Sequence, residues 1–184
     1  MSSTITARVA LSVSFNEIAT GVLPKGVWRS PIAMDLKMAN GTTTGQVDLA
    51  YGITATGIGA SVTTVYDLAG SLTDLSGATI TFVDVCTIAI RNKSATVANY
   101  LTVGPDATAG FGVVASNLGF WADASDRNVV SADYNASDGD SSWLILHCRT
   151  GVVVGAGSTD ELAVITQGGT SANTWDIVIL GRSA

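Results

Sequence analysis

The sequence predicts an all-β protein, an antiparallel β-sandwich or jelly-roll-like fold, with an N-terminal arm or added strands before it. Apolar residues recur at every second position in many short segments, which is the period of a β-strand. Turns rich in Gly, Asn and Asp separate these segments at spacings of about 8 to 15 residues. Amphipathic helical patterns do not alternate with the strands, which disfavours a parallel α/β fold.

The bulk composition indicates a self-sufficient domain with an unusually uncharged surface. A chain of 184 residues can bury about 70% of the surface that it exposes when unfolded, so its core needs no disulfide or structural metal to be stable. Only 13% of the residues are charged, against about 25% in a typical domain. Two interpretations follow. In the first, small residues such as Thr, Ser, Ala and Gly cover the surface of an ordinary β-protein. In the second, the chain is a subunit that buries much of its outer surface in an assembly, because charged residues are depleted at the cores of interfaces.

The charge pattern argues against two classes of partner. The formal net charge is −6, and the nine Lys and Arg residues are scattered without a basic run, so we expect no nucleic-acid partner. We also expect no membrane partner and no signal peptide, because there is no apolar stretch of about 18 residues and no basic segment at the N-terminus.

Cys86 and Cys148 lie in apolar strands without CxxC spacing, and we expect two reduced thiols. A disulfide would require neighbouring strands.

The first 45 residues predict two strands. Residues 5–15 alternate apolar and polar side chains, and residues 16–26 break the pattern with two glycines and a proline. Pro31 argues against a central strand, but alternation resumes from Ile32, so we predict a strand from there; a helix over 27–39 is the weaker alternative. The Asn-Gly pair in residues 40–45 is typical of a hairpin turn.

The next segment contains the strand that we place at the centre of the core. Residues 46–51 and 60–68 predict strands, and the glycine-punctuated 52–59 is a loop or a bulged continuation. Residues 67–76 predict a turn that holds one short helical turn. From residue 80 onwards an unbroken alternation predicts a long strand, one face of which carries Ile80, Phe82, Asp84, Cys86, Ile88 and Ile90.

The remainder of the chain predicts further short strands and a less regular stretch between them. The predicted strands cover residues 99–103, 128–132, 143–149 and 161–166, and 174–180, with a short glycine-bounded segment at 151–157. The last strand places Trp175, Ile177 and Ile179 on one face.

No residue pattern predicts catalysis, a cofactor or a metal. His147 is the only histidine, and the adjacent Cys148 points to the opposite face of the strand, so the two cannot form a dyad. Cys86 could approach His147 only through the tertiary fold, and we interpret His147 as a structural or interface residue. Residues 138–142 resemble half a calcium loop without its glutamate, and we interpret them as a turn. Asp123 and Asp126 have the same interpretation.

The four tryptophans divide into two groups. Trp143 and Trp175 begin apolar strands, which favours packing in the core or at its rim. Trp28 and Trp121 lie in irregular segments and are better candidates for intersubunit anchors.

Several segments together resemble a group of small virion proteins of tailed bacteriophages. The resemblance rests on VDL at 47–49, DLAG at 67–70, LTDLSGATITF at 72–82, DELAVIT at 160–166 and WDIVILG at 175–181. It covers residues 45–184. These motifs are structural, and we interpret Asp67, Asp74 and Asp84 within and beside them as turn and edge residues. At residues 84 and 86 the group would carry a basic or an aliphatic residue.

The resemblance implies a jelly-roll-like structural subunit of a phage particle. The role it implies is a capsid decoration or cement protein, a homo-oligomer and most simply a homotrimer, whose partner is the major capsid protein lattice. The protein would be made in the host cytoplasm and located on the capsid surface of the virion. Residues 1–44 would form an arm that reaches a neighbouring subunit or the shell, and residues 45–184 the sandwich. The interface residues implied are Trp28, Pro31, Met34, Phe120 and Trp121.

Two other functions remain open. A tail or fibre component would use exposed aromatic side chains to bind a host glycan. An enzyme such as a glycan depolymerase would need a pair of carboxylates, and nothing singles out such a pair among the thirteen aspartates.

Overall fold

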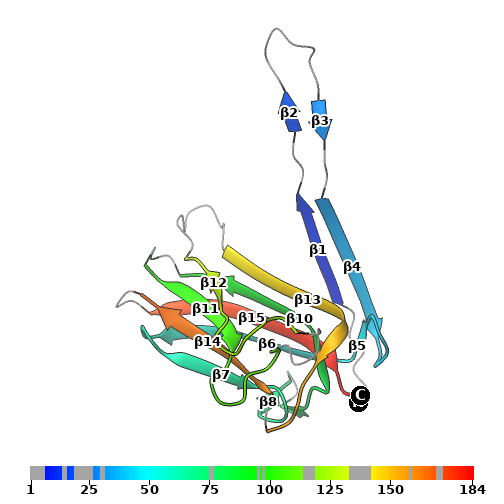
Figure 1. Cartoon of the computed structure of the whole chain (residues 1–184), viewed down its shortest axis with the longest axis vertical. Coiled ribbons are helices and arrows are strands. Elements are labelled where there is room, and N and C mark those ends of the chain that lie inside the picture. The colour runs from blue at the N-terminus through cyan, green and yellow to red at the C-terminus, as the bar shows by residue number, and fades with distance from the viewer. Residues whose placement is uncertain are drawn as a thin grey trace.

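In a computed structural model of this chain, the structure describes residues 7–13, 16–18, 27–29, 32–74, 77–94, 96, 98–113, 119–132, 142–157, 159–168 and 172–184. Across these residues every regular element is a β-strand (Figure 1), which confirms the predicted all-β class. The strands are β1 (Ala7–Val13), β2 (Asn16–Ile18), β3 (Val27–Arg29), β4 (Ile32–Asn40), β5 (Gln46–Val47), β6 (Leu49–Ile58), β7 (Thr63–Asp67), β8 (Leu72–Thr73), β9 (Thr79–Ile80), β10 (Asp84–Asn92), β11 (Tyr100–Pro105), β12 (Asn128–Val130), β13 (Ser142–Val153), β14 (Glu161–Gln167) and β15 (Asn173–Arg182).

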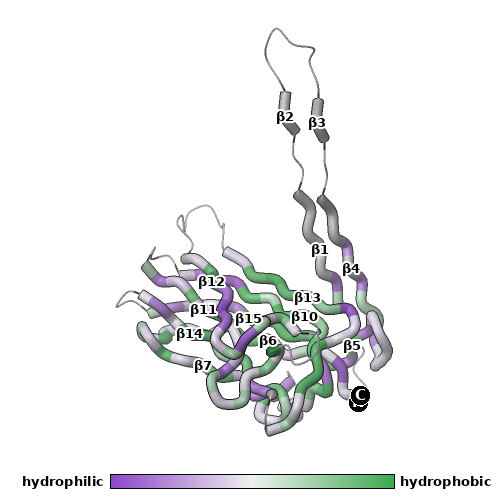
Figure 2. The backbone as a smooth tube through the Cα atoms, in the orientation of Figure 1, coloured by the Kyte–Doolittle hydropathy of each residue, from purple (hydrophilic) through white to green (hydrophobic). Residues whose placement is uncertain are grey.

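Two four-stranded sheets form the body of the molecule. The β10 sheet has the strand order β13-β10-β15-β6, and the β14 sheet has the order β12-β11-β14-β7. All neighbouring strands within both sheets are antiparallel, and the sheets pack face to face (Figure 1), so the predicted antiparallel sandwich is confirmed. Along the strands of this body, hydrophobic segments recur between more polar ones (Figure 2).

The core fills the space between the two sheets. The β10 sheet contributes Ile88, Ile90, Trp175, Ile177 and Ile179, all fully buried, and the β14 sheet contributes Leu101, Val103, Leu162 and Val164. The predicted sharing of one face by Trp175, Ile177 and Ile179 is therefore confirmed, and the fold turns that face into the core. Burial of each such side chain stabilises the fold by about 1.5–3 kcal/mol. The Trp175 indole N–H donates to the hydroxyl of Tyr66 at 3.2 Å, so the one polar atom of this indole is satisfied by a side chain from the opposite sheet.

The central strand departs from its predicted alternation. The predicted strand is interrupted between β9 and β10. In addition, the register of β10 shifts between Val85 and Thr87 against both neighbouring strands. A β-bulge inserts one extra residue and so reverses the facing of the residues that follow it. Val85 therefore enters the main core, whereas Cys86 lies on the other face of the sheet, in a separate cluster. The expectation that Cys86 shares a face with Ile88 and Ile90 is wrong for this reason.

A two-stranded ribbon projects from the body (Figure 1). Antiparallel β1 and β4 pair from Ala7 with Met38 to Val13 with Ile32, and antiparallel β2 and β3 lie further out. At its base, β4 pairs with β5 in parallel. The Asn40–Gly41 pair therefore does not make the predicted hairpin, because the chain takes a longer excursion over residues 41–45 before β5 begins.

Three further details concern strand ends and turns. β6 runs unbroken to Ile58, with a register shift opposite β15, so the bulged alternative for residues 52–59 is confirmed. β13 continues through Gly151, whose φ of 81° suits glycine, and residues 151–153 form no separate strand. The described part of the turn after β7 contains no helical turn.

Candidate interaction surface

The outer face of the β10 sheet carries an exposed apolar patch. Its members are neighbours across the four strands: Ile145 pairs with Ala89, Ala89 with Val178, and Val178 with Gly52. Trp143 lies beside this row, two residues before Ile145. The exposed fractions of Trp143, Ile145 and Val178 are 58%, 36% and 42%. We call Gly52, Ala89, Trp143, Ile145 and Val178 the outer apolar patch; all except Ile145 line a shallow depression of about 510 Å³.

Polar groups border this patch on one side. The Arg91 guanidinium lies 5.5 Å from the centre of the Trp143 ring, on the neighbouring strand, and so holds the indole by a cation–π contact. The Asp176 carboxylate receives hydrogen bonds from the Thr54 hydroxyl at 2.6 Å and from Lys93 Nζ at 3.4 Å. An apolar centre with a polar rim is the usual anatomy of a protein-binding surface.

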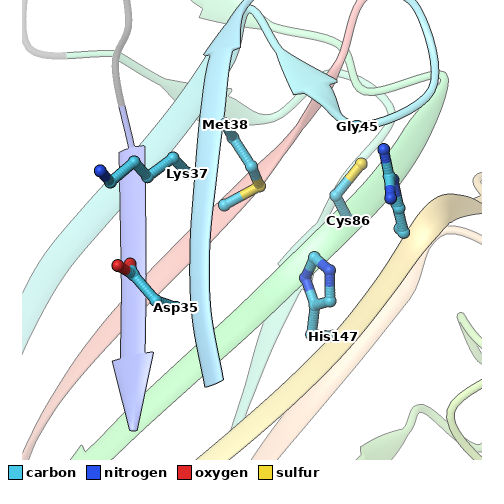
Figure 3. Close-up of a pocket in the computed structure, with 7 residues that line it drawn as sticks. Asp35, Lys37, Met38, Gly45, Cys86 and His147 are labelled. Atoms are coloured by element: carbon cyan, nitrogen blue, oxygen red, sulfur yellow. The ribbon is translucent and has the colours of Figure 1, made fainter. Parts of the chain in front are cut away.

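A second cavity lies where the ribbon joins the body (Figure 3). It has a volume of about 420 Å³ and is lined by Asp35, Lys37, Met38, Gly45, Cys86, His147 and Arg149. Met38 lies on the side of β4 that faces Cys86 and His147, whereas Asp35 and Lys37 point away from them. The fold therefore brings Cys86 and His147 to one cavity, which the positions of these residues in the sequence could not show.

The chemistry of this cavity favours a structural role for both residues. His147 Nδ1 lies 2.9 Å from the Thr87 hydroxyl oxygen, and burial lowers the pKa of His147, so the ring is neutral at pH 7. Burial also raises the pKa of Cys86 to about 11. A thiol with that pKa is protonated at neutral pH and is a poor nucleophile. Among the described residues, no group of three or more His, Cys, Asp or Glu side chains is placed to hold a metal ion.

We expect the two thiols to differ strongly in reactivity. Both cysteines are free, as predicted, with Cys86 buried and Cys148 partly exposed. At pH 8 only about 0.1% of a thiol with a pKa of about 11 is thiolate, and the burial of Cys86 also keeps reagents away, whereas Cys148 is partly open to solvent. Titration of the native protein with DTNB should therefore label Cys148 rapidly and Cys86 only after unfolding in urea. Cys86→Ser and Cys148→Ser variants assign the two phases, and equal rates in the native state would contradict the burial of Cys86.

The structure moves one predicted anchor into the core. Trp121 is 4% exposed, and its indole N–H donates to Asn128 Oδ1 at 2.7 Å. Phe120 makes edge contacts with Trp121 and Phe111, with ring centroids 5.7 and 6.1 Å apart. Trp121 therefore has almost no surface for a second subunit, and it is replaced as a candidate by Trp143, which the sequence assigned to the core or its rim.

The other predicted interface residues belong to the ribbon. Trp28 lies in β3 and Met34 in β4, while Pro31 lies outside the described residues. Asp123 and Asp126 accept backbone N–H groups of their own loop. The backbone N–H of Ser125 donates to Asp123 at 2.7 Å, and that of Ala122 donates to Asp126 at 3.1 Å. This is turn chemistry, as interpreted from the sequence. The half calcium loop at 138–142 lies outside the described residues except for Ser142.

Comparison with protein-family models, curated protein sequences and solved structures finds no match. Within the part of the chain that the structure describes, no helix has the length and apolar character needed to cross a membrane. The function is therefore argued from the surfaces and from the motifs of the sequence.

Proposed function

We propose that this chain is a structural virion protein of a tailed bacteriophage, a capsid decoration or cement protein that binds the major capsid protein lattice and acts as a homo-oligomer on the capsid surface. The observation that carries the proposal is a two-stranded ribbon that extends from a weakly charged sandwich with an exposed apolar patch. Such a chain offers two surfaces for contacts with other subunits. It needs neither a cofactor nor a catalytic residue to perform this role.

The segments that resemble phage virion proteins serve the sandwich in this structure. Leu72, Ile80 and Phe82 are buried in the main core. The Asp67 carboxylate accepts the backbone N–H of Ala69 at 2.9 Å, and Asp74 accepts that of Ala78 at 2.9 Å. Their sequence interpretation as turn residues is confirmed. The resemblance thus consists of residues that build one corner of a fold, which supports a related subunit rather than a related active site.

The proposed mechanism is mass action. A protein that binds the assembled shell and not its separated subunits stabilises the shell by its binding free energy, about 2.7 kcal/mol per site when its free concentration is 100 times Kd. Many equivalent sites on a lattice multiply this effect. The ribbon and the outer apolar patch provide surface area for such contacts, and no catalytic step is involved.

We expect particles that lack this protein to release their DNA at a lower temperature than wild-type particles. The measurement is a thermal-release assay with a DNA-binding dye on particles made with and without the gene. Adding the purified protein back to deficient heads is the control and should restore the release temperature. Deficient particles that are as heat-stable as the wild type would overturn the cement role.

A tail or fibre component that binds a host glycan is the second candidate, and the exposure of Trp143 favours it. An exposed indole next to Arg91 and Asp176 has the apolar face and polar neighbours that sugar binding uses. The number of copies per particle separates the two candidates, since hundreds indicate the head and a handful indicates the tail. A glycan screen with wild type and Trp143→Ala then tests the second candidate directly; Trp121 is too buried to serve in that test.

A further inference from the structure

The backbone register of the ribbon pairs apolar residues with each other at alternate positions. In an antiparallel pair, residues directly opposite each other share a face, and the facing alternates along the strand. The register of β1 and β4 therefore puts four apolar pairs on one side: Ala7–Met38, Val9–Leu36, Leu11–Met34 and Val13–Ile32. The other side carries Arg8–Lys37, Ala10–Asp35 and Ser12–Ala33, and Arg8 and Asp35 form an exposed ion pair of 2.8 Å there.

The base of this apolar face already contacts the outer face of the β10 sheet in the same chain. Met38 is 4% exposed and clusters with Val47, Cys86 and Leu180, while Ala7 and Ala50 pack against this cluster. Leu180 belongs to β15, and it lies on the same face of that strand as Val178, two residues away. The ribbon face and the sheet face are therefore complementary where they meet at the base of the ribbon.

Beyond this contact the two faces separate. The ribbon continues away from the body (Figure 1), so that its apolar face extends past Met38 by three more apolar pairs. The sheet face continues in the other direction from Leu180 to the exposed Val178, Ile145 and Trp143. An isolated two-stranded ribbon is only marginally stable in water, because one of its faces has nothing to pack against. The patch residues Trp143, Ile145 and Val178 are exposed in the chain, and a ribbon of two strands gains stability from a partner.

We propose that the apolar face of the ribbon of one copy lies on the outer apolar patch of a second copy, so that copies of this chain assemble through their ribbons. A second copy is the occupant because this pair of faces already packs together at the ribbon base. The ribbon is long enough to cross the sheet, since the seven residues of β1 span about 23 Å and the four strands of the β10 sheet extend over about 14 Å. Arg8 and Asp35, on the opposite side of the ribbon, stay in solvent.

The proposal depends only on these two faces and does not require the capsid assignment. It chooses the neighbouring subunit, rather than the shell, as the partner of the ribbon. Leu11 and Met34, in the middle of the apolar ribbon face, are the residues expected over Val178 and Ile145.

The first test is the mass of the full-length chain by light scattering during size-exclusion chromatography at tens of micromolar. We expect an oligomer for the wild type and at least a tenfold weaker self-association for Val178→Asp and for Leu11→Asp. Val129→Asp is the matched control, because Val129 is 64% exposed on β12 of the other sheet. Circular dichroism verifies that the variants fold. A monomeric wild type, or equal effects of Val178→Asp and Val129→Asp, would overturn the proposal whether or not the protein binds capsids.

A second test locates the contact and holds even if one aspartate variant fails to fold. Two chains are made without native cysteines, one with Leu11→Cys and the other with Val178→Cys, and are mixed under mild oxidation. We expect a disulfide-linked heterodimer that forms in the mixture at least tenfold faster than in a mixture of Leu11→Cys with Val129→Cys chains. Equal rates in the two mixtures would show that the ribbon does not lie on the patch.

Discussion

Replacement of Asp84 by alanine is expected to lower the free energy of unfolding by about 3–5 kcal/mol. Asp84 and Arg182 form an ion pair in which Nη2 lies 2.7 Å from Oδ2 and Nε lies 2.8 Å from Oδ1. The side chains are only 13% and 5% exposed, and Arg182 also donates to the carbonyl oxygen of Thr150. Alanine at position 84 would leave the guanidinium buried without its counter-ion. The cost is large because the buried guanidinium has lost its hydration and would keep only the carbonyl oxygen of Thr150 as a partner in place of the carboxylate.

Urea unfolding measures this effect, and the chain provides a matched control. Asp176 forms an exposed ion pair with Lys93 at 3.4 Å, so Asp176→Ala should cost only about 0–1 kcal/mol. Asp84→Leu combined with Arg182→Met should recover most of the stability, because the double replacement leaves no unpaired charge. Similar losses for Asp84→Ala and Asp176→Ala would show that the buried pair does not have the strength argued here.

Replacement of Asn92 by aspartate is expected to cost about 4 kcal/mol or more, enough to prevent folding at 37 °C if the native chain has ordinary stability. Asn92 is fully buried at the end of β10. Its amide nitrogen lies 3.0, 3.2 and 2.9 Å from the carbonyl oxygens of Asn99, Val130 and Ser131. These carbonyls belong to and flank β11 and β12, so one side chain ties the β10 sheet to the opposite sheet. A carboxylate would bring negative charge against three acceptors and lose every donor.

The control for this prediction is another asparagine-to-aspartate change. Asn128 Oδ1 accepts the Trp121 indole N–H at 2.7 Å, and a carboxylate at position 128 can still accept it. We therefore expect Asn128→Asp to change the unfolding free energy in urea by no more than about 1 kcal/mol. Asn92→Ala should lie between the two aspartate variants, because it removes the donors without adding charge. A small effect of Asn92→Asp would mean that water, rather than this amide, satisfies the three carbonyls.

Neither Asp84 nor Asn92 could be singled out from the sequence. The sequence predicts a turn or edge position for Asp84, but Asp84 begins the central strand β10, which has a neighbour on each side. Its partner Arg182 lies at the far end of the chain, and only the antiparallel pairing of β10 with β15 places the two opposite each other. A polar residue inside an apolar run reveals its partner only when the strand order is known.

The sequence by itself determined the all-β class, the positions of most strands and, where no bulge intervenes, the residues that share a strand face. Trp175, Ile177 and Ile179 are correctly placed on one face, and Asp67 and Asp74 in turns, because period-two alternation and side-chain-to-backbone hydrogen bonds depend on near neighbours in the chain.

Tertiary structure alone decided which face of each strand is covered. Alternation separates Trp143 from Leu144 but does not say which of them meets the second sheet. The bulge before Thr87 reversed the facing of Cys86, and the strand order brought Cys86 and His147 to one cavity. The ribbon and the outer apolar patch follow from the same cause, since a surface becomes a candidate interface only once the fold has left it uncovered.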